Sequence, residues 1–323
     1  MTTPLYRDAV RHGWRLAREH MWLWPLGMFA ALLGQMGLLE LLTKVGLAAS
    51  DYGVYPHWLA LPKLFGAIGD VGPFHINVSG VVWMVWLTIA LIGLCLFFLF
   101  VSVVSQGALI HIAAISSGKK NLPSIGPSWH ASVGHFWRLL AIHAIKKGVF
   151  VLLTVAVGWA TLNMMQDITG MDFVLFLLVF LLASTVGVIL SFLVIYMSGY
   201  AVVEEYSLWQ AMQAGWRLFT DHWLVSFEVG VIILGLNVVV GLMGLFAVML
   251  FFFPSIFLWV VALFTGNTLI YGIGLIVGIT LSIISVILIG SVFSVFTIAT
   301  WTYLFTKMYI HGIASRLLGW TRR

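Results

Sequence analysis

Three segments of the chain place a tryptophan, an arginine and a histidine at the same spacing. They are residues 9–20, 132–143 and 211–222. In each segment, arginine and leucine follow the tryptophan directly, and a histidine stands six positions after it. A guanidinium group binds phosphate through paired hydrogen bonds, and three converging imidazoles can ligate zinc. The repeated spacing is therefore compatible with two functions, namely the binding of a phosphate or acidic group and the binding of a metal ion.

The arginines have two interpretations. Each can bind a lipid phosphate or an acidic group of a partner protein. Alternatively, each anchors its helix at a membrane boundary, with the tryptophan in the interface and the arginine reaching to water. Anchoring is the favoured interpretation, because every copy directly precedes a long apolar run. The candidate lipid or partner contacts are Arg7, Arg11, Trp14, Arg15, Arg18, Trp137, Arg138, Trp216 and Arg217.

The histidines His20, His143 and His222 do not predict a metal site, because nothing in the sequence brings the three helix ends together. A helix-end cap or an interfacial polar contact is the favoured role. Glu228 and Asn237 form a candidate intramembrane polar site within an apolar run. Glu228 is either a proton or cation relay or, as we favour, the partner of an arginine from another copy. Asn237 is expected to hydrogen-bond between helices.

No catalytic or cofactor-binding motif occurs in the chain. The phosphate-binding GxxxxGK[ST] loop, the GxSxG elbow, the HExxH helix and the dinucleotide GxGxxG pattern are all missing. Cys95 is the single cysteine, which rules out an intrachain disulfide. The sequence predicts a protein without enzymatic activity, without a cofactor and without a metal site.

The composition is that of a membrane protein. The 323 residues are 62% hydrophobic and only 8% charged, whereas soluble chains carry about 25% charged residues. Lipid admits only helices and closed barrels, and the long apolar runs do not alternate as barrel strands do. The net charge of +5 comes from basic residues between apolar runs, which is typical of cytoplasmic loops rather than of a nucleic-acid surface.

Six spans account for the apolar runs and the charges. They are expected at about residues 24–42, 81–114, 146–166, 172–203, 223–250 and 271–304. Pro254 is expected to end the fifth, which leaves residues 251–265 as an outer or re-entrant apolar segment. With both termini cytoplasmic, every lysine and arginine except Lys44 and Lys63 lies on the inner side, as the positive-inside rule requires. Gly274 and Gly278 form a GxxxG pair that predicts close helix packing.

Each motif segment predicts an amphipathic helix that lies on the inner leaflet before a transmembrane hairpin. In the first, the expected apolar face carries Tyr6, Val10, Trp14, Ala17 and Met21, beside the strip of arginines. The same offsets recur in the other two segments, which indicates an internal repeat. One all-helical membrane domain, residues 1–323, is therefore divided into repeats at 1–124, 125–206 and 207–323.

The Ala-x3-Gly-Trp-x-Leu helix before a hairpin resembles a loose group of bacterial multi-pass proteins. The stretch from Gln106 to Ile110 also fits this group. The group comprises the membrane domain of some glycerophosphodiester phosphodiesterases and the uncharacterised YciC-like inner-membrane proteins. The catalytic domain of those phosphodiesterases has no counterpart in these residues. The resemblance implies a prokaryotic inner (plasma) membrane location and no catalytic activity.

Three functions remain open. The favoured one is a structural or scaffold subunit of a membrane complex, or a membrane organiser. Its expected partners are anionic lipid headgroups at the cytoplasmic face, and other membrane subunits or further copies of the chain. A lipid or small-molecule permease is the alternative, because transporters are often built from repeats. An intramembrane lipid-modifying enzyme has only Glu228 and the histidines in its favour.

Overall fold

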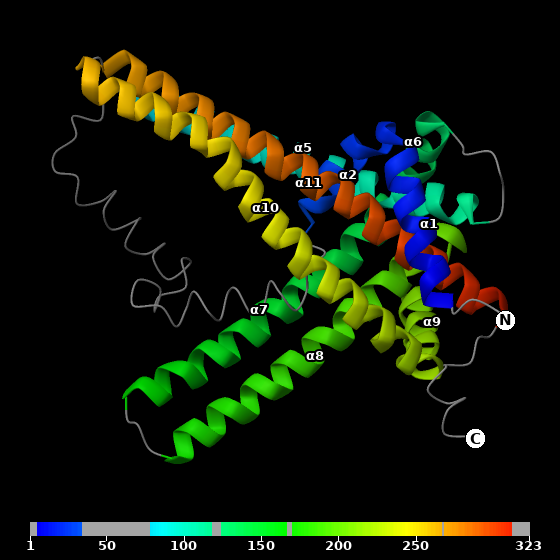
Figure 1. The fold of residues 1–323 in the computed structure, drawn as a ribbon. Helices are drawn as coiled ribbons and strands as arrows, with labels where there is room; N and C mark the ends of the chain where they lie inside the picture. Colours follow the sequence, from blue (N-terminus) through cyan, green and yellow to red (C-terminus); the bar gives the residue numbers. More distant parts are fainter. Residues whose placement is uncertain (1–4, 34–77, 118–123, 167–169, 267, 312–323) are drawn as a thin grey trace. The chain divides into compact units, whose positions relative to one another are not determined.

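The computed structural model describes residues 5–33, 78–117, 124–166, 170–266 and 268–311, whose regular structure is helical (Figure 1). The long helices are α5 (Val78–Ser116), α7 (Phe136–Gln166), α8 (Gly170–Val203), α10 (Trp223–Thr265) and α11 (Thr268–His311). The short ones are α1 (Leu5–Glu19), the 3-10 turn η1 (Met21–Leu23), α2 (Trp24–Ala31), α6 (Ile125–Gly134) and α9 (Leu208–Asp221).

Five of these helices, α5, α7, α8, α10 and α11, are long and apolar enough to cross a membrane. This supports the predicted class, an all-helical multi-pass membrane protein. The first predicted span, residues 24–42, begins as α2, and the rest of it lies outside the described residues. The number of six spans therefore stays a prediction.

The long helices exceed the thickness of a bilayer. At about 1.5 Å per residue, a 43-residue helix such as α10 is about 65 Å long, whereas the hydrocarbon core measures about 30 Å. The excess length predicted for the second span is confirmed, because α5 has 39 residues. These helices must tilt strongly or extend into the aqueous layer.

Pro254 does not end the fifth span, so that prediction is wrong. Helix α10 continues through the proline to Thr265, and the supposed outer segment of residues 251–265 is its second half. A proline removes one backbone hydrogen bond and can bend a helix without ending it. The residues on both sides of Pro254 are apolar, and the second half of α10 packs on α11.

The chain forms two compact units, and three of the boundaries between them fall inside α5, α7 and α8. The first comprises residues 1–33, 102–139 and 195–323, and the second residues 34–101 and 140–194. In the first unit α11 is central, because α10, α1 and α2 all pack on it (Figure 1). In the second unit, α7 contacts α8 where the ring of Phe150 lies 3.7 Å from where a Cβ on Gly187 would stand.

Small residues allow the neighbouring helices to lie close to α11. A Cβ on Gly13 of α1 would stand 2.9 Å from Phe296 O and would overlap the Thr300 hydroxyl. A Cβ on Gly278 of α11 would stand 2.8 Å from the Cβ of Ser255 in α10. The predicted packing role of the GxxxG pair is thereby confirmed, since close backbone approach is what glycine permits at such crossings.

Gly13→Ala should separate α1 from α11, because the atoms that the new methyl meets include backbone that cannot move aside. Overpacking of this kind costs about 1–3 kcal/mol, so the thermal midpoint of the purified protein should fall by several degrees. Gly235→Ala is the matched control, since nothing lies within 4 Å of a Cβ there. Equal midpoints for the Gly13 and Gly235 variants would contradict the packing described.

Candidate functional site

Each motif segment turns its small residues toward the protein. In α1, Ala9, Gly13 and Leu16 are buried, and the equivalent positions of α9 are buried as well. These equivalents are Ala211, Gly215 and Leu218. The positions that the first and third copies share, Ala-x3-Gly-x2-Leu, therefore form a packing face.

Each motif helix packs on a long helix through this face. Helix α1 lies on α11, as described above, and a Cβ on Gly215 of α9 would stand 3.1 Å from the Met197 side chain of α8. In the second copy the hydroxyl of Ser132 donates to Val104 O of α5 at 2.7 Å. Ser132 occupies the position of the first alanine in the other copies. A different contact thus attaches each of the three motif segments to a long helix.

The predicted apolar face is distinct from the packing face and is largely exposed, although its Ala17 is buried. Trp14 is 54% exposed, Met21 is 66% exposed, and the equivalent Trp216 and Trp223 are 52% and 56% exposed. Successive residues of a helix are rotated by about 100°, so this strip borders the packing strip instead of coinciding with it. Glycine and alanine are buried because they let two helix backbones approach.

The second copy is divided between two helices. Helix α6 ends at Gly134, and α7 begins at Phe136 and runs on into the span. Trp137, which is 77% exposed, and Arg138 therefore stand in the first turn of α7. The amphipathic helix predicted here is broken at His135, where the other two copies are continuous through their Trp-Arg pair.

The equivalent arginines fall into two groups. Arg138 donates to Glu205 O at 2.9 Å and to Tyr206 O at 3.4 Å, in the turn between α8 and α9. Glu205 has a positive φ of 56°, a backbone conformation that costs a non-glycine residue about 1 kcal/mol. The other candidate arginines are exposed and have no hydrogen-bond or ion-pair partner among the described residues. They are Arg7, Arg11, Arg15, Arg18 and Arg217.

The motif histidines do not converge within the described part of the chain. His20 and His222 stand at helix junctions, as predicted, although neither side chain makes a capping hydrogen bond. His143 lies inside α7 and is buried. Among the described residues, no group of three or more histidine, cysteine, aspartate or glutamate side chains is arranged to hold a metal ion.

His12 is a site residue that sequence reasoning missed. Its Nε2 lies 3.0 Å from the hydroxyl of Ser116 at the end of α5, and its ring stacks on Tyr303 of α11 at 4.7 Å. Burial, together with the nearby charges of Arg15 and Lys307, lowers the pKa of His12. The ring is therefore neutral at neutral pH and joins three helices, a role that only long-range contacts reveal.

The predicted intramembrane polar site is not assembled in the described residues. Glu228 is half-buried in the second turn of α10, and no described arginine pairs with it. Asn237 donates to Ile233 O of its own helix at 3.0 Å, and its Oδ1 accepts no hydrogen bond from the described residues. The expected interhelical bond of Asn237 is thus replaced by a bond within one turn.

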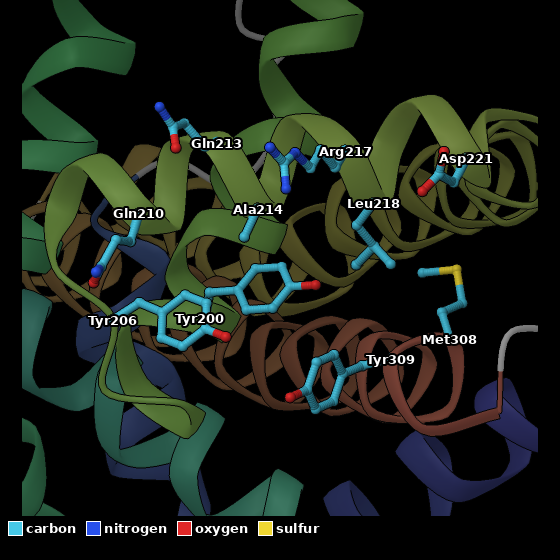
Figure 2. A pocket seen from close by; sticks show the side chains of 10 residues that line it. All are labelled: Tyr200, Tyr206, Gln210, Gln213, Ala214, Arg217, Leu218, Asp221, Met308 and Tyr309. Carbon is cyan, nitrogen blue, oxygen red and sulfur yellow. The ribbon is translucent and has the colours of Figure 1, made fainter.

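A pocket of about 580 Å³ lies beside α9, between the end of α8 and the end of α11 (Figure 2). Three tyrosines line it, namely Tyr200, Tyr206 and Tyr309, together with Arg217 and Asp221 of α9. The sequence had singled out Arg217 alone, because the pocket forms only where α8 and α9 meet Met308 and Tyr309 of α11, which lie far along the chain. Arg217 is thereby distinguished from Arg15, which does not line this pocket.

Comparison with known proteins adds no relative. No family model, no curated protein and no solved structure matches the chain. The resemblance suggested by the motif helices therefore stays a prediction. The function has to be argued from the residues themselves.

Arg138→Ala should destabilise the turn between α8 and α9, because two carbonyl acceptors lose their charged donor beside the strained Glu205. A hydrogen bond from a charged group contributes about 1.5–3 kcal/mol, and partial exposure reduces this. A fall of several degrees in the thermal midpoint is expected. Arg15→Ala, at the equivalent position without such bonds, is the control, and an equal fall for both variants would contradict this division of roles.

Proposed function

We propose that this chain is a non-catalytic protein of a prokaryotic inner membrane, with both termini cytoplasmic, that organises lipids or supports a membrane complex. The observation that carries the proposal is the arrangement of the motif helices. Their small residues are buried on long helices, while Trp14 and Trp216 stay exposed beside arginines. In a soluble protein such tryptophans would be costly, whereas at a membrane interface they are favourable.

Helix α1 carries the strongest electrostatic argument. Its four exposed arginines, Arg7, Arg11, Arg15 and Arg18, follow one another at helical spacing. With about 100° per residue, their strip borders the strip of Val10 and Trp14 and lies away from the packing strip. An interfacial helix needs this order, since the apolar strip enters the acyl boundary while the arginines meet the headgroups.

Anionic lipids are the partners that such a surface favours. Each lysine or arginine near a negatively charged leaflet contributes about 1 kcal/mol of attraction. The same rule supports a cytoplasmic location for this face, because basic residues accumulate on that side. The scaffold role follows from the same surface, which can hold lipids between neighbouring subunits or between copies of this chain. Membership of the YciC-like group and a repeat of helix plus hairpin are part of this proposal.

A permease is the second candidate, and one observation favours it. Several buried oxygens on long helices accept no hydrogen bond from the described residues, among them Ser105 Oγ and Gln106 Oε1 of α5 and Ser198 Oγ of α8. Buried oxygens without partners cost about 1–3 kcal/mol each. A polar solute or water that passes between the helices would satisfy them.

The lipid proposal predicts that the triple variant Arg11→Gln, Arg15→Gln and Arg18→Gln loses phosphatidylglycerol. Removing three charges of about 1 kcal/mol each should weaken its binding at least about tenfold. Native mass spectrometry of the protein released from phosphatidylglycerol and phosphatidylcholine nanodiscs measures the bound lipid. The matched control replaces the same arginines by lysine and should retain it. Equal retention by the glutamine variant would contradict the lipid role of α1.

A further inference from the structure

We propose that the pocket beside α9 binds a zwitterionic phospholipid headgroup, a phosphate joined to an ammonium group. The inference rests on the proposed function in one respect, namely that α9 lies at a membrane surface. The ligand differs from the one proposed for α1, because the arginine strip of α1 selects anionic lipids. The pocket combines three features that such a headgroup requires.

The first feature is an aromatic wall. The rings of Tyr200 and Tyr206 stack at 5.5 Å with an interplanar angle of 10°, and Tyr309 meets Tyr200 edge-on at 5.8 Å (Figure 2). The faces of tyrosine rings attract cations, and the faces that Tyr200 and Tyr206 do not turn toward each other are those that can meet an alkylammonium group. This wall suits the amine end of the headgroup.

The second feature is a mixed set of charges. Arg217 extends from α9 toward the tyrosines, whereas Gln213 turns away from them (Figure 2). One turn further along α9 stands Asp221, and Glu204 accepts a hydrogen bond from the Tyr309 hydroxyl at 3.3 Å. Of the charged groups that line the pocket, the Arg217 guanidinium can bind a phosphate and the Asp221 carboxylate attracts an ammonium group. A purely anionic ligand would be attracted by the first and repelled by the second.

Arg217 and Asp221 are also available to a ligand. They stand four residues apart on one helix, the spacing of an ordinary surface ion pair. No ion pair joins them, and no hydrogen bond occupies either side chain among the described residues. Each can therefore bind its own part of a ligand.

The third feature is an apolar side beside the charged groups. Ala214 and Leu218 of α9 and Met308 of α11 also line the pocket. Its volume of about 580 Å³ lies within the usual range of small-ligand sites, about 300–1,000 Å³. A headgroup together with the glycerol and the start of the acyl chains would fill it, with the acyl chains continuing into the membrane.

Lipid competition in nanodiscs tests the proposal. The full-length protein is placed in discs of equal phosphatidylethanolamine and phosphatidylglycerol, and the lipid that stays bound is measured by native mass spectrometry. The variants Asp221→Asn and Arg217→Gln each remove one half of the recognition. Arg15→Gln is the matched control, because it removes the equivalent arginine outside the pocket. Size-exclusion profiles identical to wild type establish that the variants are folded.

We expect wild type and Arg15→Gln to retain phosphatidylethanolamine, and each pocket variant to retain it at least about tenfold less, the loss for one charged hydrogen bond. Soluble glycerophosphoethanolamine, but not glycerophosphate, should displace the lipid. If the soluble headgroup displaces the lipid when both are at the same concentration, the pocket binds the free headgroup as well as it binds the lipid. If a higher concentration of the soluble headgroup is needed, the lipid is the preferred ligand. Unchanged retention in both pocket variants would overturn the proposal. That result would leave phosphatidylglycerol binding by α1 untouched, so the two proposals fail separately.

Discussion

Close backbone contact between a short helix and a long one is the constraint on which the rest of this structure depends. Gly13 lets α1 lie so close to α11 that an added Cβ would overlap α11, and Gly215 lets α9 lie in tight contact with Met197 of α8. In the second copy, where Phe136 replaces this glycine, the helix breaks and Ser132 instead bonds to α5. Glycine at this position therefore decides whether a continuous motif helix can lie against its neighbour.

Burial of the small residues leaves the tryptophans of the motif helices exposed. Trp14 and Trp216 are exposed because they sit one helical step from the packing glycine. The arginines that follow these tryptophans in the motif make different contacts. Arg138 holds the turn at Glu205, whereas Arg217 lines a pocket with tyrosines from α8 and α11. The same motif arginine thus has different surroundings in the two copies, because the neighbouring helices differ.

The sequence predicted the helical class, most of the long helices and the GxxxG packing, because each depends on local composition or short spacing. It did not single out the small residues of the packing face, since hydrophobicity ranks Trp14 above Gly13 whereas backbone approach ranks them the other way. Pro254 was overrated as a helix end, because a proline alone does not outweigh a continuous apolar run. The role of Arg138 and the pocket were out of reach, because both depend on residues distant in sequence.

Site-directed spin labelling of α1 in membranes tests the central claim most directly. Replacing Cys95, the single cysteine, by serine permits one label at a time at Arg7, Val10, Arg11 and Trp14. Oxygen concentrates in lipid, whereas a charged nickel chelate stays in water. We expect oxygen collisions to dominate at positions 10 and 14 and nickel collisions at positions 7 and 11. Equal nickel access at all four positions would contradict it, because α1 would then lie in water and not at a membrane surface.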